Sequence, residues 1–460
     1  MQPTPPTSRS IAREIGALIL LFAIACIPSI GQAIASSILL VMVFGRPTRT
    51  FKCLVAGAIV TFITITTVKS YGGSLFSVGP KWVLLSAACA RSLVAEGRPT
   101  KIYWRLINYW GLLTGALVIN SLFVSAVPSI STFKSISFSL GVLCVIRLAM
   151  LTSDQNTEML LFVSEMGTAV VILSIPLLPL DIGWALFSGA YFNGIFDHPQ
   201  ALGIFLVMTG AASFVVAFKL PHLQRELIIC GLVQWSLIYF THCRTALVAV
   251  LLGGIVYIIE VFIRGGKSSR MRFVSVFSIV ISVIGITLAL MLFPNLRESV
   301  AMFIRKGNVE SFTSTEERIA ALSTGTRGAQ ITNDFDIIAE HPLLGYGFGV
   351  SPGSEGYLDP NTVQLWGVPL SAPIEQGFLP LATIAQIGVV GSLFILAFLF
   401  SMYRSARRSS AEDAGLFVAV IGVNFGEMIF FSFGSMGGLV WVMLVFLAVN
   451  GSMSGSPPEY

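Results

Sequence analysis

The chain has 460 residues, of which 55% are hydrophobic and 11% are charged. Soluble domains carry roughly 25% charged residues, so this composition excludes a soluble globular protein. The net charge of +5 does not indicate nucleic acid binding, because the Lys and Arg residues cluster in short segments between apolar runs, as a membrane orientation signal requires.

Apolar runs of about 15 to 22 residues recur along the chain and predict an all-α, polytopic membrane protein with about 12–14 transmembrane helices. The first run lacks a small-residue cleavage site, so we expect it to remain as a span rather than act as a signal peptide. The predicted spans are 15–30, 32–45, 53–69, 80–95, 105–127, 135–151, 159–180, 200–218, 226–241, 245–263, 273–293, 377–403, 414–432 and 435–449.

A polar segment divides these runs into three predicted parts. Residues 1–293 form an N-terminal helix bundle, residues 294–375 a loop domain, and residues 376–460 the C-terminal helices with a tail. A loop of this length is rarely a mere connection, so we expect it to be structured. Its capping residues and apolar spacing predict helices near 316–322 and 330–340.

The distribution of basic residues predicts the orientation. It places both termini in the cytoplasm and the 294–375 loop outside, in agreement with the positive-inside rule. The short outside loops hold only Lys69, Lys81, Lys134 and Arg244. The segments predicted inside hold Arg9, Arg13, Arg46, Arg49, Lys52, Arg98, Lys101, Arg105, Lys219, Arg225, Arg264, Lys267, Arg270, Arg272, Arg404, Arg407 and Arg408.

Two arginines are candidates for anion binding. Arg244 opens an apolar run, and its side chain either extends to lipid phosphates or faces inward to bind an anionic ligand through its planar fork. Arg327 directly precedes the predicted helix 330–340. Together with the N–H groups of that helix it would form an anion site, and the alternative is an exposed loop arginine.

Three histidines, His198, His242 and His341, lie on the outer side in this orientation. They are too far apart in the sequence and too poor in partners to predict a metal site. The outer segments also lack a carboxylate cluster that would suit Mg²⁺ or Mn²⁺. The sequence therefore favours a metal-independent mechanism without a cofactor.

Glycines alternate with aromatic residues in the loop. Gly345, Gly347 and Gly349 do not follow a strand and match no nucleotide-binding pattern, so we expect a tight turn close to other backbone. Four aromatic residues are expected to present exposed faces, which either stack on sugar rings or rest at the lipid interface. They are Tyr346, Phe348, Tyr357 and Trp366.

Glu375 lies where the loop re-enters the membrane. An acidic residue at this border is costly unless it is hydrated or partnered. A desolvated glutamate there could take a proton from a sugar hydroxyl. The alternative is that Glu375 orients a neighbouring residue or caps the re-entering helix.

Four stretches spread through the chain follow one another in the same order as the motifs of a known superfamily. They are Gly-Ile-Phe-Asp-His-Pro-Gln-Ala-Leu-Gly at 194–203, His-Cys-Arg-Thr-Ala-Leu at 242–247, Gly-Thr-Arg at 325–327 with His-Pro-Leu-Leu-Gly-Tyr-Gly-Phe-Gly at 341–349, and Glu-Gln-Gly-Phe-Leu at 375–379 with Ile-Gly-Val-Val-Gly at 387–391. Together they resemble the O-antigen ligase and Wzy-type polysaccharide polymerase superfamily, and within it the exopolysaccharide repeat-unit polymerases. The 341–349 stretch is the most specific of the four.

The resemblance implies a GT-C-like fold and a pyrophosphate site. In that family two arginines bind the pyrophosphate of a polyprenyl-linked glycan, which here implies Arg244 and Arg327. The ligases place a histidine where this chain has Glu375, and Gln386 stands where a later acid is common. The implied catalytic residues are Glu375, Arg244 and Arg327. The implied substrate-binding residues are His198, His242, His341, Tyr346 and Trp366.

The function implied is that of a polysaccharide polymerase in the bacterial inner membrane, with its large loop in the periplasm. It would join undecaprenyl-pyrophosphate-linked repeat units by inverting glycosyl transfer, among membrane lipids, with a chain-length co-polymerase and a flippase as further partners. The nearest alternative is an O-antigen ligase that uses a lipid A core acceptor. Alternatives of other classes are a polysaccharide or lipid transporter and a non-catalytic assembly subunit.

Overall fold

The computed structural model describes residues 7–27, 30–63, 75–97, 100–185, 191–264, 326–350, 364–365, 368–369, 379–426, 429–433 and 436–453. For residues 75–81, 185, 326–330, 364–365, 368–369 and 450–453 it describes the backbone alone. The helices in these ranges are α1 (Ser8–Ala25), α2 (Ile30–Met42), α3 (Pro47–Val60), α4 (Leu75–Val94), α5 (Lys101–Phe123), α6 (Pro128–Leu151), α7 (Asn156–Ser174), α8 (Pro199–Lys219), α9 (Gln224–Thr241), α10 (Arg244–Ile263), α14 (Thr326–Glu340), α15 (Leu379–Ser409), α16 (Ala411–Gly422) and α17 (Met436–Met453).

The predicted all-α, polytopic architecture is confirmed. Within the described ranges, a helix overlaps each of the predicted spans, whereas the span 273–293 lies outside those ranges. By length and composition alone, six of the described helices are able to cross a membrane, namely α5, α6, α7 with its flanking turns, α8, α10 and α15. Extended structure in the described part consists of two antiparallel pairs, β1 (Trp184–Ala185) with β2 (Tyr191–Phe192) and β3 (Gln364–Leu365) with β4 (Val368–Pro369), and of an isolated bridge between Ile63 and Phe196.

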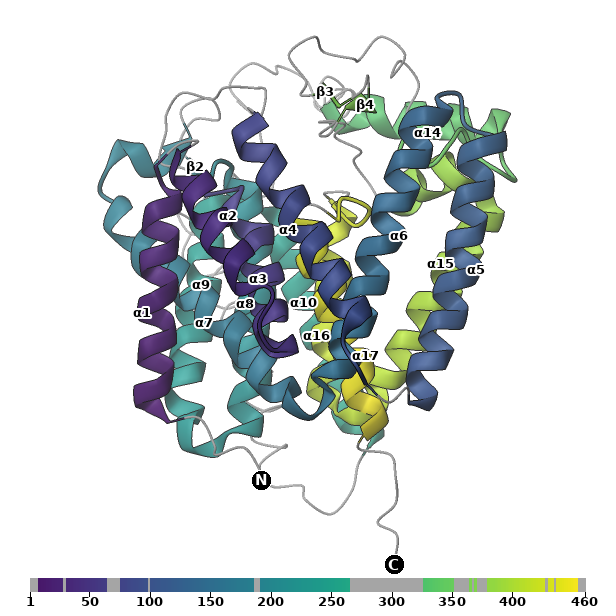
Figure 1. Cartoon of the computed structure of the whole chain (residues 1–460). Helices are drawn as coiled ribbons and strands as arrows, with labels where there is room; N and C mark the ends of the chain where they lie inside the picture. The colour runs from purple at the N-terminus through teal and green to yellow at the C-terminus, as the bar shows by residue number, and fades with distance from the viewer. Residues whose placement is uncertain are drawn as a thin grey trace, which may run out of the picture.

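The helices stand side by side and successive helices reverse direction, which gives the bundle two distinct ends (Figure 1). The loop end is the end at which α8 and α10 begin and across which α14, β3 and β4 lie. The basic end is the opposite one, at which α1 begins and α17 ends. The described arginines and lysines of the segments predicted inside lie at the basic end, among them Arg46, Lys52, Lys219, Arg264 and Arg407.

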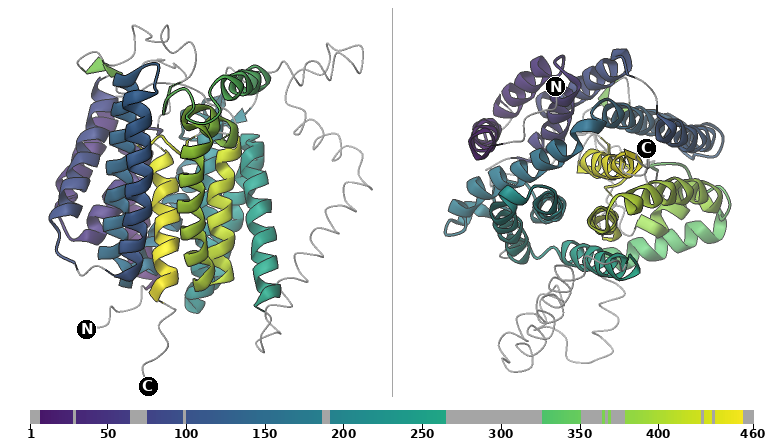
Figure 2. Two further views of the ribbon diagram at one scale, coloured as in Figure 1. Left: turned by 90° about the vertical axis from the view of Figure 1, so that its right-hand side faces the viewer. Right: turned by 90° about the horizontal axis from the view of Figure 1, so that it is seen from below.

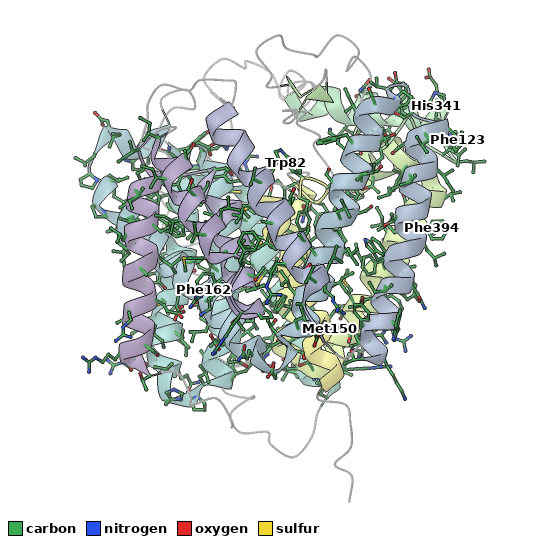
Figure 3. All side chains as sticks on the ribbon, viewed as in Figure 1. Trp82, Phe123, Met150, Phe162, His341 and Phe394 are labelled. Carbon is green, nitrogen blue, oxygen red and sulfur yellow. The ribbon has the colours of Figure 1, made fainter. Side chains whose placement is uncertain are left out.

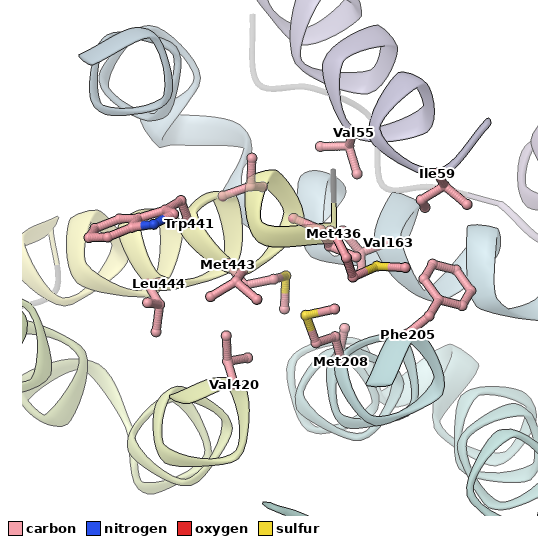
Figure 4. Close-up of a cluster of buried hydrophobic side chains, with 14 of the residues drawn as sticks. Val55, Ile59, Val163, Phe205, Met208, Val420, Met436, Trp441, Met443 and Leu444 are labelled. Atoms are coloured by element: carbon pink, nitrogen blue, oxygen red, sulfur yellow. The ribbon is translucent and has the colours of Figure 1, made fainter. Parts of the chain in front are cut away.

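α17 runs through the middle of the bundle, as the view from below shows (Figure 2). Every residue from Met436 to Val449 is buried, as expected for a helix that is apolar all round. Figure 4 shows its contacts: Met436 and Met443 meet Met208 and Phe205 of α8. This core fixes the positions of the helices that carry the loop end.

Some helix boundaries differ from the predicted ones for local reasons. α1 begins at Ser8 rather than near residue 15, because the Thr7 side chain accepts a hydrogen bond from the Ser10 N–H at 3.3 Å and caps the helix. α15 continues to Ser409, where Ser410 caps α16 by accepting from the Asp413 N–H at 3.0 Å. α16 ends at Gly422 and a short 3₁₀ helix follows at Val423–Phe425, so α16 covers only the first part of the span predicted at 414–432.

Candidate functional site

The turn between α9 and α10 lies at the loop end and carries Arg244. His242 ends α9 in the left-handed conformation, with φ of 51°, and the Cys243 N–H donates to Thr241 Oγ1 at 3.2 Å. Arg244 is then the first residue of α10, and no side chain caps that helix. The N-terminal end of a helix favours negative charge, so the turn combines a helix start with a guanidinium group.

The start of α8 packs against this turn because α8 has a glycine there. A Cβ at Gly203 would come within 2.5 Å of the Cys243 Cβ and 2.9 Å of Thr241 Oγ1. His198 caps α8, since its Nδ1 accepts from the Gln200 N–H at 3.2 Å. The stretches 194–203 and 242–247, which are far apart in the sequence, therefore meet at the loop end.

His242 is half-buried between two tyrosines. Its ring centroid lies 4.9 Å from that of Tyr191 on β2 and 6.2 Å from that of Tyr239 on α9. Burial, and after it the positive charge of Arg244, lower the pKa of His242 from its ordinary 6.5. His242 is therefore neutral at neutral pH, and Arg244 supplies the positive charge of this pair.

The stretch 341–349 docks onto a break in α15. Gly388 interrupts that helix with φ of 65°, and the loop bonds to the exposed backbone. The Tyr346 N–H donates to the Ala385 carbonyl at 2.8 Å, and the Val389 N–H donates to the Pro342 carbonyl at 3.0 Å. Gly345 has φ of 73° and lies so close to the Gln386 backbone that a Cβ would collide with it. The predicted tight turn against other backbone is confirmed.

Side chains from the membrane helices hold the same loop. Asn120 of α5 donates to the Leu344 carbonyl at 2.6 Å and accepts from the Phe348 N–H at 2.8 Å. Gln386 accepts from the Gly349 N–H at 2.8 Å, and Lys134 Nζ of α6 donates to the Gly349 carbonyl at 2.6 Å. The sequence did not identify Asn120, Lys134 or Gln386 as supports, because their partners are backbone groups far away in the chain.

The expectation that Phe348 is exposed is wrong. Phe348 is fully buried, and its ring centroid lies 5.0 Å from that of Phe431 and 5.8 Å from that of Phe138. Its backbone is drawn into the bundle by Asn120, so the aromatic side chain enters the core. Tyr346 is half-buried, with its ring centroid 6.1 Å from that of the exposed His341, which is labelled in Figure 3.

α14 confirms the helix predicted at 330–340 and extends it back to Thr326. Arg327 lies in its first turn, with only the backbone described. Asp334, which sequence reasoning missed, is half-buried one turn before the buried Ile337, and burial raises its pKa to about 6. Asp334 lies seven residues after Arg327, so the two residues share one face of α14. This spacing is the sequence signal that could have identified Asp334.

Several predicted residues and segments lie outside the described ranges, namely Glu375, Trp366, Tyr357 and the helix predicted at 316–322. The structure packs the start of α8, which His198 caps, against the turn that carries His242 and Arg244, and it separately places His341 beside Tyr346. Arg244 and Arg327 both open helices at the loop end, and their convergence on one anion stays a prediction. In the described part of the chain, no group of three or more His, Cys, Asp or Glu residues is arranged to hold a metal ion.

Comparison with known families gives one match. Residues 229–396 match the family model Wzy_C, which is described as O-Antigen ligase. This range contains His242, Arg244, Arg327 and the docked loop 341–349, up to the break in α15. No curated protein matches the chain.

Proposed function

We propose that the chain is a polysaccharide polymerase of the O-antigen ligase and Wzy superfamily of glycosyltransferase-like enzymes, because residues 229–396 match the family model described as O-Antigen ligase. It joins undecaprenyl-pyrophosphate-linked repeat units at the outer face of the bacterial inner membrane. The loop end faces the periplasm in this proposal, and both chain termini lie in the cytoplasm. The likeness to exopolysaccharide polymerases supports this choice.

The position of Arg244 carries the proposal. It opens α10 without a side-chain cap, beside a neutral histidine and against the start of α8. The oxygens of a pyrophosphate can accept the two parallel hydrogen bonds of a guanidinium group. The free backbone N–H groups at a helix start can donate to the same anion. Arg327, in the first turn of α14, supplies the second cation.

The reaction is a single displacement. A hydroxyl oxygen of the acceptor repeat unit attacks the anomeric carbon of the growing glycan, and the bond from that carbon to the pyrophosphate oxygen breaks. The leaving pyrophosphate keeps the electron pair, and the two arginines stabilise its charge. Glu375 takes the proton of the attacking hydroxyl, and the anomeric configuration inverts.

Arginine-to-lysine exchange tests the pyrophosphate site. Arg244→Lys and Arg327→Lys keep the charge but lose the bidentate fork, so turnover of lipid-linked repeat units should fall about 10²-fold. Arg225→Lys is the matched control, because Arg225 is exposed at the opposite end of α9. Normal polymer from both site variants would contradict the proposal.

The acceptor distinguishes the polymerase from the ligase. Purified protein is given lipid-linked repeat units either alone or together with lipid A core. A ladder of longer lipid-linked glycans without the core supports the polymerase. Transfer to the core without such a ladder would instead assign the ligase function.

The orientation has a separate test. Asn333 is exposed on α14, and Glu226 is exposed where α9 begins at the basic end. In a chain whose Cys243 is replaced by Ser, Asn333→Cys should react with an impermeant thiol reagent in intact spheroplasts, whereas Glu226→Cys should react only after permeabilisation. The reverse pattern would overturn the proposed orientation.

A further inference from the structure

A cluster of charged side chains lies inside the basic end, remote from the loop end. Lys52 of α3 contacts two glutamates from different helices: its Nζ lies 2.7 Å from Glu14 Oε1 of α1 and 3.2 Å from Glu158 Oε1 of α7. Lys52 Nζ also lies 5.2 Å from the ring centroid of Phe162, which is labelled in the lower half of the bundle in Figure 3. The single ammonium group of Lys52 therefore forms ion pairs with two carboxylates.

A third carboxyl group lies deeper in the same cluster. Glu165 is seven residues beyond Glu158 on α7 and only 3% exposed. Its carboxyl group contacts that of Glu14, and its Oε2 has no hydrogen-bond partner among the described residues. The side chains of Glu14 and Glu158 are each 43% exposed, so Glu14 connects the buried group with solvent at the basic end.

The charged side chains around Glu165 do not balance the negative charge of its carboxylate. The charged groups that face it are Glu14 from α1, Lys52 from α3 and Glu158 from its own helix. α8 and α9 present the uncharged Ser213 and Gln234 to the adjoining turns of α7. Three carboxyl groups therefore share one cation, and two of them are in direct contact inside the protein.

We propose that Glu14 and Glu165 form a proton-binding site at the basic end. A carboxylate as deeply buried as that of Glu165 is unstable in its charged form when a second carboxylate touches it, whereas one proton between the two turns repulsion into a hydrogen bond. The proton also supplies the partner that Glu165 Oε2 lacks. Its route of entry is the half-exposed Glu14, so in the proposed orientation the site is filled from the cytoplasm.

The site links α1 to α7, so the presence of the shared proton should stabilise the folded protein. Unfolded glutamates lose their protons above about pH 4.3, whereas the proposed site holds one proton for as long as the two carboxyl groups stay in contact. The folded state then binds more protons than the unfolded state, so the unfolding free energy falls as the pH rises. Loss of the shared proton leaves two carboxylates in contact and weakens the attachment of α1.

Infrared difference spectroscopy of the purified full chain in detergent tests the site directly. The wild type should show, near neutral pH, the C=O stretching band of a protonated carboxylic acid, and this band should vanish at alkaline pH. Glu165→Gln should remove the band because the amide cannot titrate. Glu158→Gln is the matched control on the same helix and should keep it. A wild type without the band, or a band unchanged in Glu165→Gln, would overturn the proposal.

Thermal unfolding gives a second readout. Between about pH 6 and about pH 9 the melting temperature of the wild type should fall by several degrees relative to Glu165→Gln, which mimics the protonated state at every pH. Parallel pH profiles would contradict the proposal. A melting temperature that K⁺ or Mg²⁺ raises in the wild type but not in Glu165→Gln would also overturn it, because the ligand would then be a metal cation.

Discussion

The docked loop 341–349 and the turn 242–244 lie at the same end of the bundle and differ in what holds them. Backbone and side-chain hydrogen bonds from α5, α6 and α15 fix the loop, and Gly345 lies so close to the backbone of α15 that no side chain fits there. The turn instead gathers ionisable side chains, His242 and Arg244, at an uncapped helix start.

The comparison shows that the stretch with the most specific sequence pattern need not be the one that carries the chemistry. The glycines of the stretch with the most specific pattern act as a scaffold, since positive φ angles and close packing require glycine at these positions. The weaker pattern around Arg244 supplies the groups that can bind a phosphate. Variants of scaffold residues should therefore change stability, and variants of chemical residues should change rate in a folded protein.

The largest expected effect is on rate and concerns Glu375. Glu375→Gln keeps the shape and removes the basicity, so polymerisation should fall by about 10² to 10⁴ while donor binding persists. Glu375→His should retain part of the activity, because histidine can also act as a base. The measurement is turnover of lipid-linked repeat units by purified protein, together with a donor-binding assay.

A Glu375→Gln enzyme that turns over at the wild-type rate would exclude the base role. The search would then move to the acidic residues and histidines at the loop end. Among them are Asp197, His198, His341 and Asp334, and burial raises the pKa of Asp334 to about 6.

The next effect is on stability and concerns the break in α15. A Cβ at Gly388 would collide with the Leu343 carbonyl, and the positive φ adds strain. Gly388→Ala should cost about 3 kcal/mol of unfolding free energy and lower the melting temperature in detergent. Gly254→Ala on α10, where nothing lies within 4 Å, is the control and should change little. Equal melting temperatures for the two variants would show that the loop can move away.

Asn120 offers a smaller test of the same scaffold. Asn120→Leu has a similar shape but loses both bonds to the loop, at 2.6 and 2.8 Å, which should destabilise the protein by about 1–3 kcal/mol. The exposed Asn333→Leu serves as control. Turnover per folded molecule should stay close to wild type, and a selective loss of turnover without a fall in melting temperature would give Asn120 a chemical role.

The smallest effect is the pH response of His242. Its pKa lies below 6.5 in the folded protein, so the unfolded chain takes up the proton first as the pH falls, and stability declines below about pH 6.5. His242→Asn removes this titration and suits the left-handed conformation at φ of 51°. The melting temperature of the variant should vary less with pH in this range. Superimposable pH profiles would assign the response to other groups.

The sequence predicted the helices well because each apolar run is long enough to form one. It missed the start of α1 and the end of α15, because capping residues determine the first and the second extends beyond the apolar run. It predicted the glycine turn from local backbone requirements. It could not predict the burial of Phe348 or the support by Asn120, because both arise from contacts more than two hundred residues apart. Arg244 and His242 were predicted as site residues, whereas the packing of α8 against their turn depends on Gly203 and was not predicted.

The break at Gly388 also bears on the order of assembly. A helix that is interrupted within a membrane bundle leaves carbonyl and N–H groups that lipid cannot satisfy. Here the partners of those groups lie in residues 342–347, which the ribosome completes before α15. The docked loop is therefore synthesised ahead of the helix that needs it, so α15 can be captured as it enters the membrane. Moving the loop behind α15 in a permuted chain should impair insertion.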